Sequence, residues 1–246
     1  MGVPACGAED WAYLSSGTWS ILGAESDRSF CSPAAAEAGL GNEQGYGGTY
    51  CVQSTVTGLW LIQEIQRLLG ITDPHILAKE AETAERFRSL INPADARFIH
   101  PADMIAEIRA ACREADEPVP QTPGELARCA YDSLALLYRH RLAVLSTITG
   151  RQFARLHVVG GGSQAMLLNQ LCASVTGLEV LAGPAEATAI GNGLAQLIAL
   201  GAIKDVASAR ALVRQSFPPQ IIMPTALPGL DCAAARFGRL STPKRL

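Results

Sequence analysis

Three consecutive glycines, Gly160 to Gly162, separate a short apolar stretch, Leu156 to Val159, from an apolar run with helical period that begins near Met166. This order predicts a strand, a tight turn and a helix. Glycine lets a ligand approach the backbone closely, and the unpaired N–H groups at the start of a helix favour a phosphate or the edge of a ring. The segment therefore indicates a nucleotide site, but a strand-to-helix turn also needs glycine for its geometry, so both interpretations stay open.

A second candidate anion site is the turn Ser15 to Thr18, between two β-rich pieces at Ala12 to Leu14 and Trp19 to Leu22. The backbone N–H groups and the three hydroxyls of this turn are suitable donors for a phosphate. The same residue types are common in any polar hairpin turn, so the pattern alone favours neither role.

Gln63 is a third candidate. The apolar spacing predicts a helix from Ser54 to Gly70, on which Gln63 continues the line of Val56 and Trp60. A polar side chain on an otherwise apolar line lies either at the edge of the helix or in contact with a ligand.

The remaining chain supplies the elements that must position these residues. We predict, in chain order, a flexible loop at Gly41 to Gly48, a helix at Ile76 to Phe87, an extended piece at Arg97 to His100, a helix from Pro101 to Ala115, a long helix from Pro123 to Gly150, a strand at Leu178 to Leu181, a helix from Gly183 to Leu200, a charged helix at Lys204 to Ser216 and a poorly patterned, proline-rich tail from Phe217. Thr122 and Glu125 form a capping box for the long helix. Hairpins followed by alternating helices and strands are typical of an α/β fold.

Composition excludes several classes of protein. The 246 residues are 48% hydrophobic with a net charge of −3 and no basic stripe, which argues against nucleic acid or an anionic membrane as a partner. No apolar run is long enough to span a membrane, and Met1 to Asp10 does not resemble a signal peptide, so we expect a cytoplasmic protein. The seven cysteines and four histidines are scattered, which argues against a metal site and favours reduced thiols, including Cys112 and Cys129.

Five segments carry a family resemblance. They are Tyr13 to Ser20, Gly58 to Gln63, Ile91 to Met104, Ala127 to Tyr138 and His157 to Ala173. Together, in this order, they resemble the C-terminal domain of the rhamnulokinases, one family among the FGGY carbohydrate kinases of the actin/hexokinase ATPase superfamily. The resemblance implies that residues 1–246 form a ribonuclease-H-like α/β domain that supplies half of an ATP site. In the complete enzyme this domain faces an N-terminal sugar-binding domain, which this chain lacks.

The resemblance also implies roles for individual residues. Thr18 matches a residue that contacts the nucleotide phosphates, Gln63 matches an ATP-contacting glutamine, and Gly161 matches a glycine that lies against the adenosine. Thr55 stands where the family has a nucleotide-contacting asparagine. The implied substrates are ATP, with Mg²⁺, and L-rhamnulose, which is phosphorylated on its 1-hydroxyl.

The catalytic aspartate of the family would fall before Met1. It is the base that accepts the proton of the sugar hydroxyl. The other acidic residues near the candidate segments have no matching motif: Asp10, Glu25, Asp27, Glu43 and Glu186. We also expect the missing segment to carry the first, central strand of the sheet. The isolated chain is therefore predicted to be inactive and prone to self-association, unless a separate N-terminal half completes it.

Two alternatives remain. The chain could be a catalytically silent remnant or a nucleotide-binding interaction module. A dinucleotide-binding domain is a weaker alternative, because Gly160 to Gly162 comes late in the chain and no final glycine follows at the required spacing.

Overall fold

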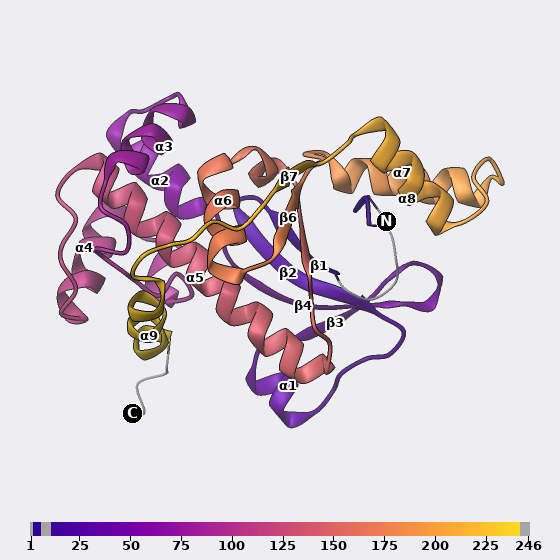
Figure 1. Cartoon of the computed structure of the whole chain (residues 1–246), viewed down its shortest axis with the longest axis horizontal. Coiled ribbons are helices and arrows are strands. Elements are labelled where there is room, and N and C mark those ends of the chain that lie inside the picture. The colour runs from indigo at the N-terminus through magenta and orange to yellow at the C-terminus, as the bar shows by residue number, and fades with distance from the viewer. Residues whose placement is uncertain (1, 6–10, 242–246) are drawn as a thin grey trace.

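A seven-stranded mixed sheet with the strand order β3-β4-β2-β1-β5-β6-β7 forms the centre of the fold. This computed structural model describes residues 2–5 and 11–241 (Figure 1). The strands are β1 (Trp11–Ser16), β2 (Trp19–Ser26), β3 (Gly41–Gln44), β4 (Tyr50–Thr57), β5 (Arg155–Val159), β6 (Glu179–Ala182) and β7 (Gln220–Ile222). The α/β class predicted from the sequence is confirmed.

Strand β1 occupies the central position. It pairs antiparallel with β2 through a register that includes Leu14 opposite Leu22, and parallel with β5, where Leu14 lies opposite Val158. The sheet therefore has no gap at its centre. Our expectation that an upstream segment must supply the central strand was wrong, because β1 itself is hydrogen-bonded on both sides.

The helices cover the sheet unevenly. They are α1 (Pro33–Glu37), α2 (Trp60–Leu69), α3 (Pro74–Thr83), α4 (Met104–Glu114), α5 (Pro123–Thr149), α6 (Met166–Thr176), α7 (Ala187–Ala199), α8 (Val206–Ser216) and α9 (Leu230–Ser241). In Figure 1, α2, α3 and α4 gather at one end of α5, whereas α7 and α8 lie together at the opposite end of the molecule. No helix in the described ranges is long and apolar enough to cross a bilayer.

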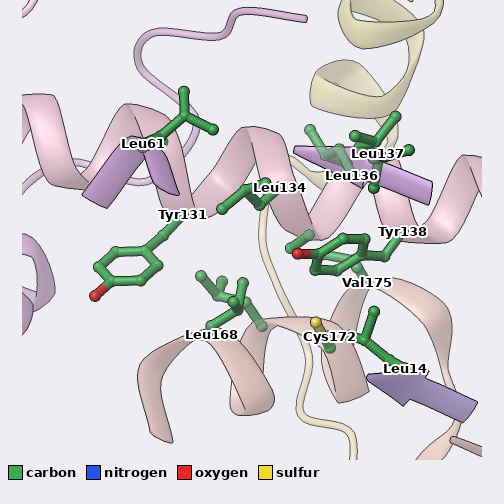
Figure 2. Close-up of a cluster of buried hydrophobic side chains, with 14 of the residues drawn as sticks. Leu14, Leu61, Tyr131, Leu134, Leu136, Leu137, Tyr138, Leu168, Cys172 and Val175 are labelled. Carbon is green, nitrogen blue, oxygen red and sulfur yellow. The ribbon is translucent and has the colours of Figure 1, made fainter. Parts of the chain in front are cut away.

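Helix α5 is the main core element. It begins with the predicted capping box, in which Thr122 accepts a hydrogen bond from the Glu125 amide while the Glu125 carboxylate accepts from the Thr122 amide. Buried α5 side chains pack over the sheet and against α6, and Figure 2 shows Leu134 and Tyr138 facing Leu168, Cys172 and Leu14. The six cysteines in the described ranges are free thiols, including Cys112 and Cys129, as predicted.

The structure corrects four sequence predictions. Residues 54–57 continue strand β4 and are not the start of a helix, and Gly41–Gln44 pairs with β4 as an edge strand within the predicted loop. A 3₁₀ turn, Ala96–Phe98, replaces the extended piece. The tail contains strand β7 and helix α9. The antiparallel strands β1 and β2 at the centre also contradict a dinucleotide-binding sheet, which is mostly parallel.

Candidate nucleotide site

The turn between β1 and β2 is fastened to the start of helix α2. The Leu59 amide donates to the Gly17 carbonyl at 2.8 Å, and the amides of Gly58 and Trp60 donate to the Thr18 carbonyl at 3.1 and 3.2 Å. These bonds satisfy N–H groups that a helix start otherwise leaves unpaired. They also bring Thr18 beside the first turn of α2.

Two of the predicted residues meet at this junction. The Thr18 Oγ1 hydroxyl donates a hydrogen bond to Gln63 Oε1 at 3.1 Å. Both side chains are exposed, so they present a hydroxyl and an amide to solvent at one point on the surface. Gln63 lies on a helix, as predicted, but this helix, α2, begins at Trp60 and is shorter than the predicted one.

The three glycines of the turn after β5 have different roles. Gly160 has a φ of +83°, and a Cβ there would lie 2.7 Å from the Ser16 carbonyl oxygen. A Cβ on Gly162 would meet the Ser16 side chain. These two glycines are therefore needed for packing against β1. Gly161 is different: it is exposed, and no atom lies within 4 Å of the point that a Cβ would occupy.

A buried amide holds this turn in place. Asn169, which is 1% exposed on α6, donates from Nδ2 to the carbonyls of Gly162 at 3.2 Å and Ser163 at 2.9 Å. Both carbonyls are thereby satisfied from one side chain. The Gly161 backbone is thus presented at a fixed place between β5 and α6.

A cavity of about 510 Å³ lies between α2, α3 and this glycine turn. Its lining includes both Gln63 and Gly161, together with apolar side chains such as Ile62 and Leu167. Small-molecule sites typically have roughly this volume, with mostly apolar walls and a few polar groups. The cavity therefore joins three predicted residues, since Thr18 is hydrogen-bonded to Gln63 at its edge.

Tyr131 on α5 also lines the cavity, and sequence reasoning did not single it out. It is 4% exposed, and burial raises the pKa of its hydroxyl to about 12, so the group stays protonated at neutral pH. The available signal was a polar-tipped aromatic residue seven positions before Tyr138, on the core side of the long helix.

Thr55 lies outside this cavity. It is exposed on β4, where it pairs across the strands with Ile21. The structure therefore does not bring Thr55 together with Thr18, Gln63 and Gly161.

The acidic residues considered as bases lie elsewhere. Glu25 forms an ion pair with Arg210 at 2.7 Å, and neither Asp27, Glu43 nor Glu186 lines the cavity. Asp10 lies outside the described residues. Within ranges 2–5 and 11–241, no three His, Cys, Asp or Glu side chains gather in a group that could hold a metal ion.

Comparison with known proteins places these features in context. Residues 12–200 match the family model described as "FGGY family of carbohydrate kinases, C-terminal domain". The chain is 47% identical over 237 residues to the rhamnulokinase of Pectobacterium atrosepticum, covering 96% of this chain and 48% of that protein. It is 48% identical over 210 residues to the rhamnulokinase of Enterobacter sp. (strain 638), covering 85% of this chain and 43% of that protein. The chain thus spans less than half the length of these curated relatives.

Solved structures agree on the fold. The xylulose kinase of Rhodospirillum rubrum superposes with a TM-score of 0.68 at 18% identity, over 97% of this chain and 47% of that one. The glycerol kinase of Plasmodium falciparum, solved with ADP, gives 0.69 at 13% identity, over 96% and 47%. At these identities the likeness establishes the ribonuclease-H-like ATPase fold alone.

Proposed function

Because this chain belongs to the FGGY family of carbohydrate kinases, we propose that residues 1–246 are the nucleotide-binding half of a rhamnulokinase. The complete enzyme would transfer the γ-phosphoryl group of ATP to the 1-hydroxyl of L-rhamnulose. The choice of sugar rests on the 47% identity to proteins of that name. We further propose the cytoplasm as the compartment, which the free thiols of the described cysteines support.

The observation that carries the nucleotide assignment is the cavity beside Gly161. Gly161 offers a backbone without a side chain at the cavity wall, so a flat ring or a ribose can lie directly against it. Gln63 and Thr18 stand at the edge of the same cavity, within hydrogen-bonding distance of each other. This arrangement offers an apolar pocket for a base next to two polar groups suited to the sugar and phosphates.

Thr18 and Gln63 would both help to position the nucleotide. Phosphoryl transfer depends mainly on alignment and on stabilisation of charge on the phosphate oxygens. The Thr18 hydroxyl would turn from Gln63 to donate to a phosphate oxygen, while the Gln63 amide would hold the nucleotide beside it. The base that takes the proton of the sugar hydroxyl is proposed to come from the other half of the enzyme, because no acidic residue of the described chain has the family motif.

Mg²⁺ is implied by the family, but the described residues do not fit a protein site for it, since no three candidate ligands lie together. We therefore propose that the ion accompanies the phosphates of ATP.

Binding of ADP to the chain, measured by ligand-observed NMR, tests the nucleotide assignment. We expect ADP to bind and the Thr18→Ala variant to bind it about 10–100-fold more weakly, the loss of one charge-assisted hydrogen bond. Thr147→Ala is the matched control, because Thr147 is an exposed threonine of α5 that bonds only the Ala143 carbonyl. A wild-type chain that shows no contact with ADP at millimolar concentration contradicts the proposal.

The choice of sugar needs a complete enzyme. Joined to the N-terminal half of the Pectobacterium relative, this chain should release ADP with L-rhamnulose and not with glycerol or xylulose. The reverse preference would remove the substrate assignment while leaving the kinase assignment intact.

The alternative is a catalytically silent nucleotide-binding module, which the cavity beside Gly161 would serve equally well. Under either proposal the isolated chain should show no turnover of ATP with L-rhamnulose. The fused enzyme distinguishes the two, because a silent remnant should stay inactive when the second half is supplied.

A further inference from the structure

Tyr131 ends in a hydroxyl for which the described residues offer no hydrogen-bond partner. Its side chain comes from the N-terminal third of the core helix α5 and is 96% buried, yet it lines the cavity beside Gly161. Figure 2 shows the ring lying beside Leu134 and Leu168 with its oxygen directed away from that apolar cluster. Burial is the sole cause of the raised pKa of this hydroxyl, with no contribution from a bonded neighbour.

Tyr138, two turns further along the same helix, shows what a structural tyrosine looks like in this core. Its hydroxyl lies 2.7 Å from the Ser20 Oγ atom, and its side chain is fully buried. A buried hydroxyl without a partner costs free energy that this pairing avoids. Tyr131 therefore retains a polar group that the packing of the core does not use.

We propose that the Tyr131 hydroxyl is a specificity-determining group that forms a hydrogen bond with the base of the bound nucleotide. This inference rests on the proposed nucleotide site and deepens it. The buried wall of the cavity around Tyr131 also contains Ile62, and apolar side chains of this kind hold a ring without distinguishing one base from another. The other polar lining residues, such as Gln63, His75 and Lys79, are exposed at the rim, so the Tyr131 hydroxyl is the polar group on the buried wall of the cavity.

Tyr131 and Thr18 lie at different places relative to the cavity, so they are expected to contact different parts of the nucleotide. Tyr131 and Gly161 line the cavity, whereas Thr18 is not among its lining residues and stands at its edge on Gln63. A nucleotide with its phosphates at Thr18 would therefore direct its base toward Tyr131. Loss of the Tyr131 hydroxyl should weaken contact with the base and leave contact with the phosphates unchanged.

The experiment compares Tyr131→Phe with Tyr138→Phe in the whole chain, using ADP, IDP and inorganic pyrophosphate as ligands. For Tyr131→Phe we expect ADP affinity to fall about 5–10-fold, the equivalent of one neutral hydrogen bond. The preference for ADP over IDP should narrow, and pyrophosphate binding should not change. The melting temperature should stay the same, because no bond to another residue is removed.

Tyr138→Phe should give the opposite pattern, with a lower melting temperature and unchanged affinity for ADP, because it breaks the bond to Ser20. The inference is overturned if Tyr131→Phe binds ADP as the wild type does, weakens ADP and pyrophosphate equally, or lowers the melting temperature as Tyr138→Phe does. A wild-type chain that binds no ADP overturns the proposed nucleotide site and this inference together, and is recognised before any variant is compared.

Discussion

At the scale of single residues, the glycine turn shows how one motif contains two kinds of requirement. Gly160 is fixed by its left-handed backbone and by the Ser16 carbonyl, and Gly162 by contact with the Ser16 side chain. Only Gly161 faces open space. The packing interpretation that the sequence left open therefore holds at two of the glycines, and the ligand interpretation stays a proposal for the third.

This contrast gives a paired prediction. Gly160→Ala should lower the free energy of unfolding by about 2–3 kcal/mol, since it adds backbone strain and a clash. Gly161→Ala should leave stability within about 0.5 kcal/mol and weaken ADP binding, because its methyl group would project where the ligand approaches. Chemical denaturation and ADP titration of both variants check it. Equal loss of stability in the two would show that Gly161 is also a packing glycine.

The residues that lie at the cavity were predictable from the sequence where they belong to a short local motif. Thr18, Gln63 and Gly161 belong to short segments whose spacing survives the errors made in the surrounding elements. Tyr131 was missed because its place in the cavity depends on α3, α2 and the glycine turn closing around it, and no local pattern encodes that enclosure. Thr55 was placed on a helix start, whereas it belongs to a strand.

At the scale of elements, the boundary between β4 and α2 shows why a helical period can mislead. Val56, Leu59 and Trp60 have helical spacing, but Val52, Ser54 and Val56 alternate on the buried face of β4. The strand prevails because pairing with β2 covers eight residues. The edge strand β3 is polar and is defined only by pairing with β4, so its sequence offers no period to detect.

The capping box of α5, in contrast, was predicted from two residues, and it carries a pH dependence. Hydrogen bonds from the Gln121 and Thr122 amides hold the pKa of Glu125 below its usual value. The group therefore contributes stability that is present above the unfolded pKa and is lost as the pH falls through the lower, folded pKa. Glu125→Gln should be less stable than the wild type at neutral pH, and the difference should shrink under acid. Urea unfolding at several pH values checks this, and a difference independent of pH would contradict it.

Helix α9 was not predicted, and its attachment explains why. Arg236 donates to the carbonyls of Phe87 at 2.8 Å and Arg88 at 3.0 Å and forms an ion pair with Glu117, whose side chain is 8% exposed. All three partners lie more than a hundred positions earlier in the chain. Such long-range contacts leave only a weak local signal, the buried pair Ala233 and Phe237.

Removal of this contact should be costly. Arg236→Met should lower the free energy of unfolding by about 2–4 kcal/mol, because the largely buried Glu117 carboxylate loses its cationic partner and two carbonyls lose a donor. Arg239→Met, a change in an exposed arginine of the same helix, should cost less than about 0.5 kcal/mol. Denaturation curves of the two variants distinguish the loss of the Arg236 contacts from a general effect of removing a positive charge. Equal losses of stability would contradict the prediction.

At the scale of the whole molecule, the exposed large apolar side chains are concentrated in one segment of the chain. Six of the twelve large apolar side chains that the described residues expose fall between positions 197 and 223: Leu197, Leu200, Leu212, Phe217, Ile221 and Met223. They belong to α7, α8, the edge strand β7 and the residues that flank these elements, and Figure 1 shows α7 and α8 projecting at one end. The opposite edge strand, β3, is composed of polar residues and glycine.

We expected self-association because of a missing central strand, but β1 fills that position, so any self-association needs a different physical reason. The 197–223 surface supplies one: an exposed edge strand with apolar side chains is a template for pairing with another copy, and exposed patches of this kind promote association. Leu200 is 81% exposed and Ile221 is 59% exposed, so a charge at either position costs little in the folded chain.

The isolated chain should therefore form oligomers as its concentration rises, and Leu200→Glu with Ile221→Lys should shift it toward the monomer. Sedimentation velocity over a concentration series measures this. Ile76→Lys is the matched control, because Ile76 is 49% exposed on α3, away from that surface, and should not change the distribution. If the chain stays monomeric throughout, its apolar surface is tolerated in water. If the control acts as strongly as the double variant, association does not depend on the 197–223 surface.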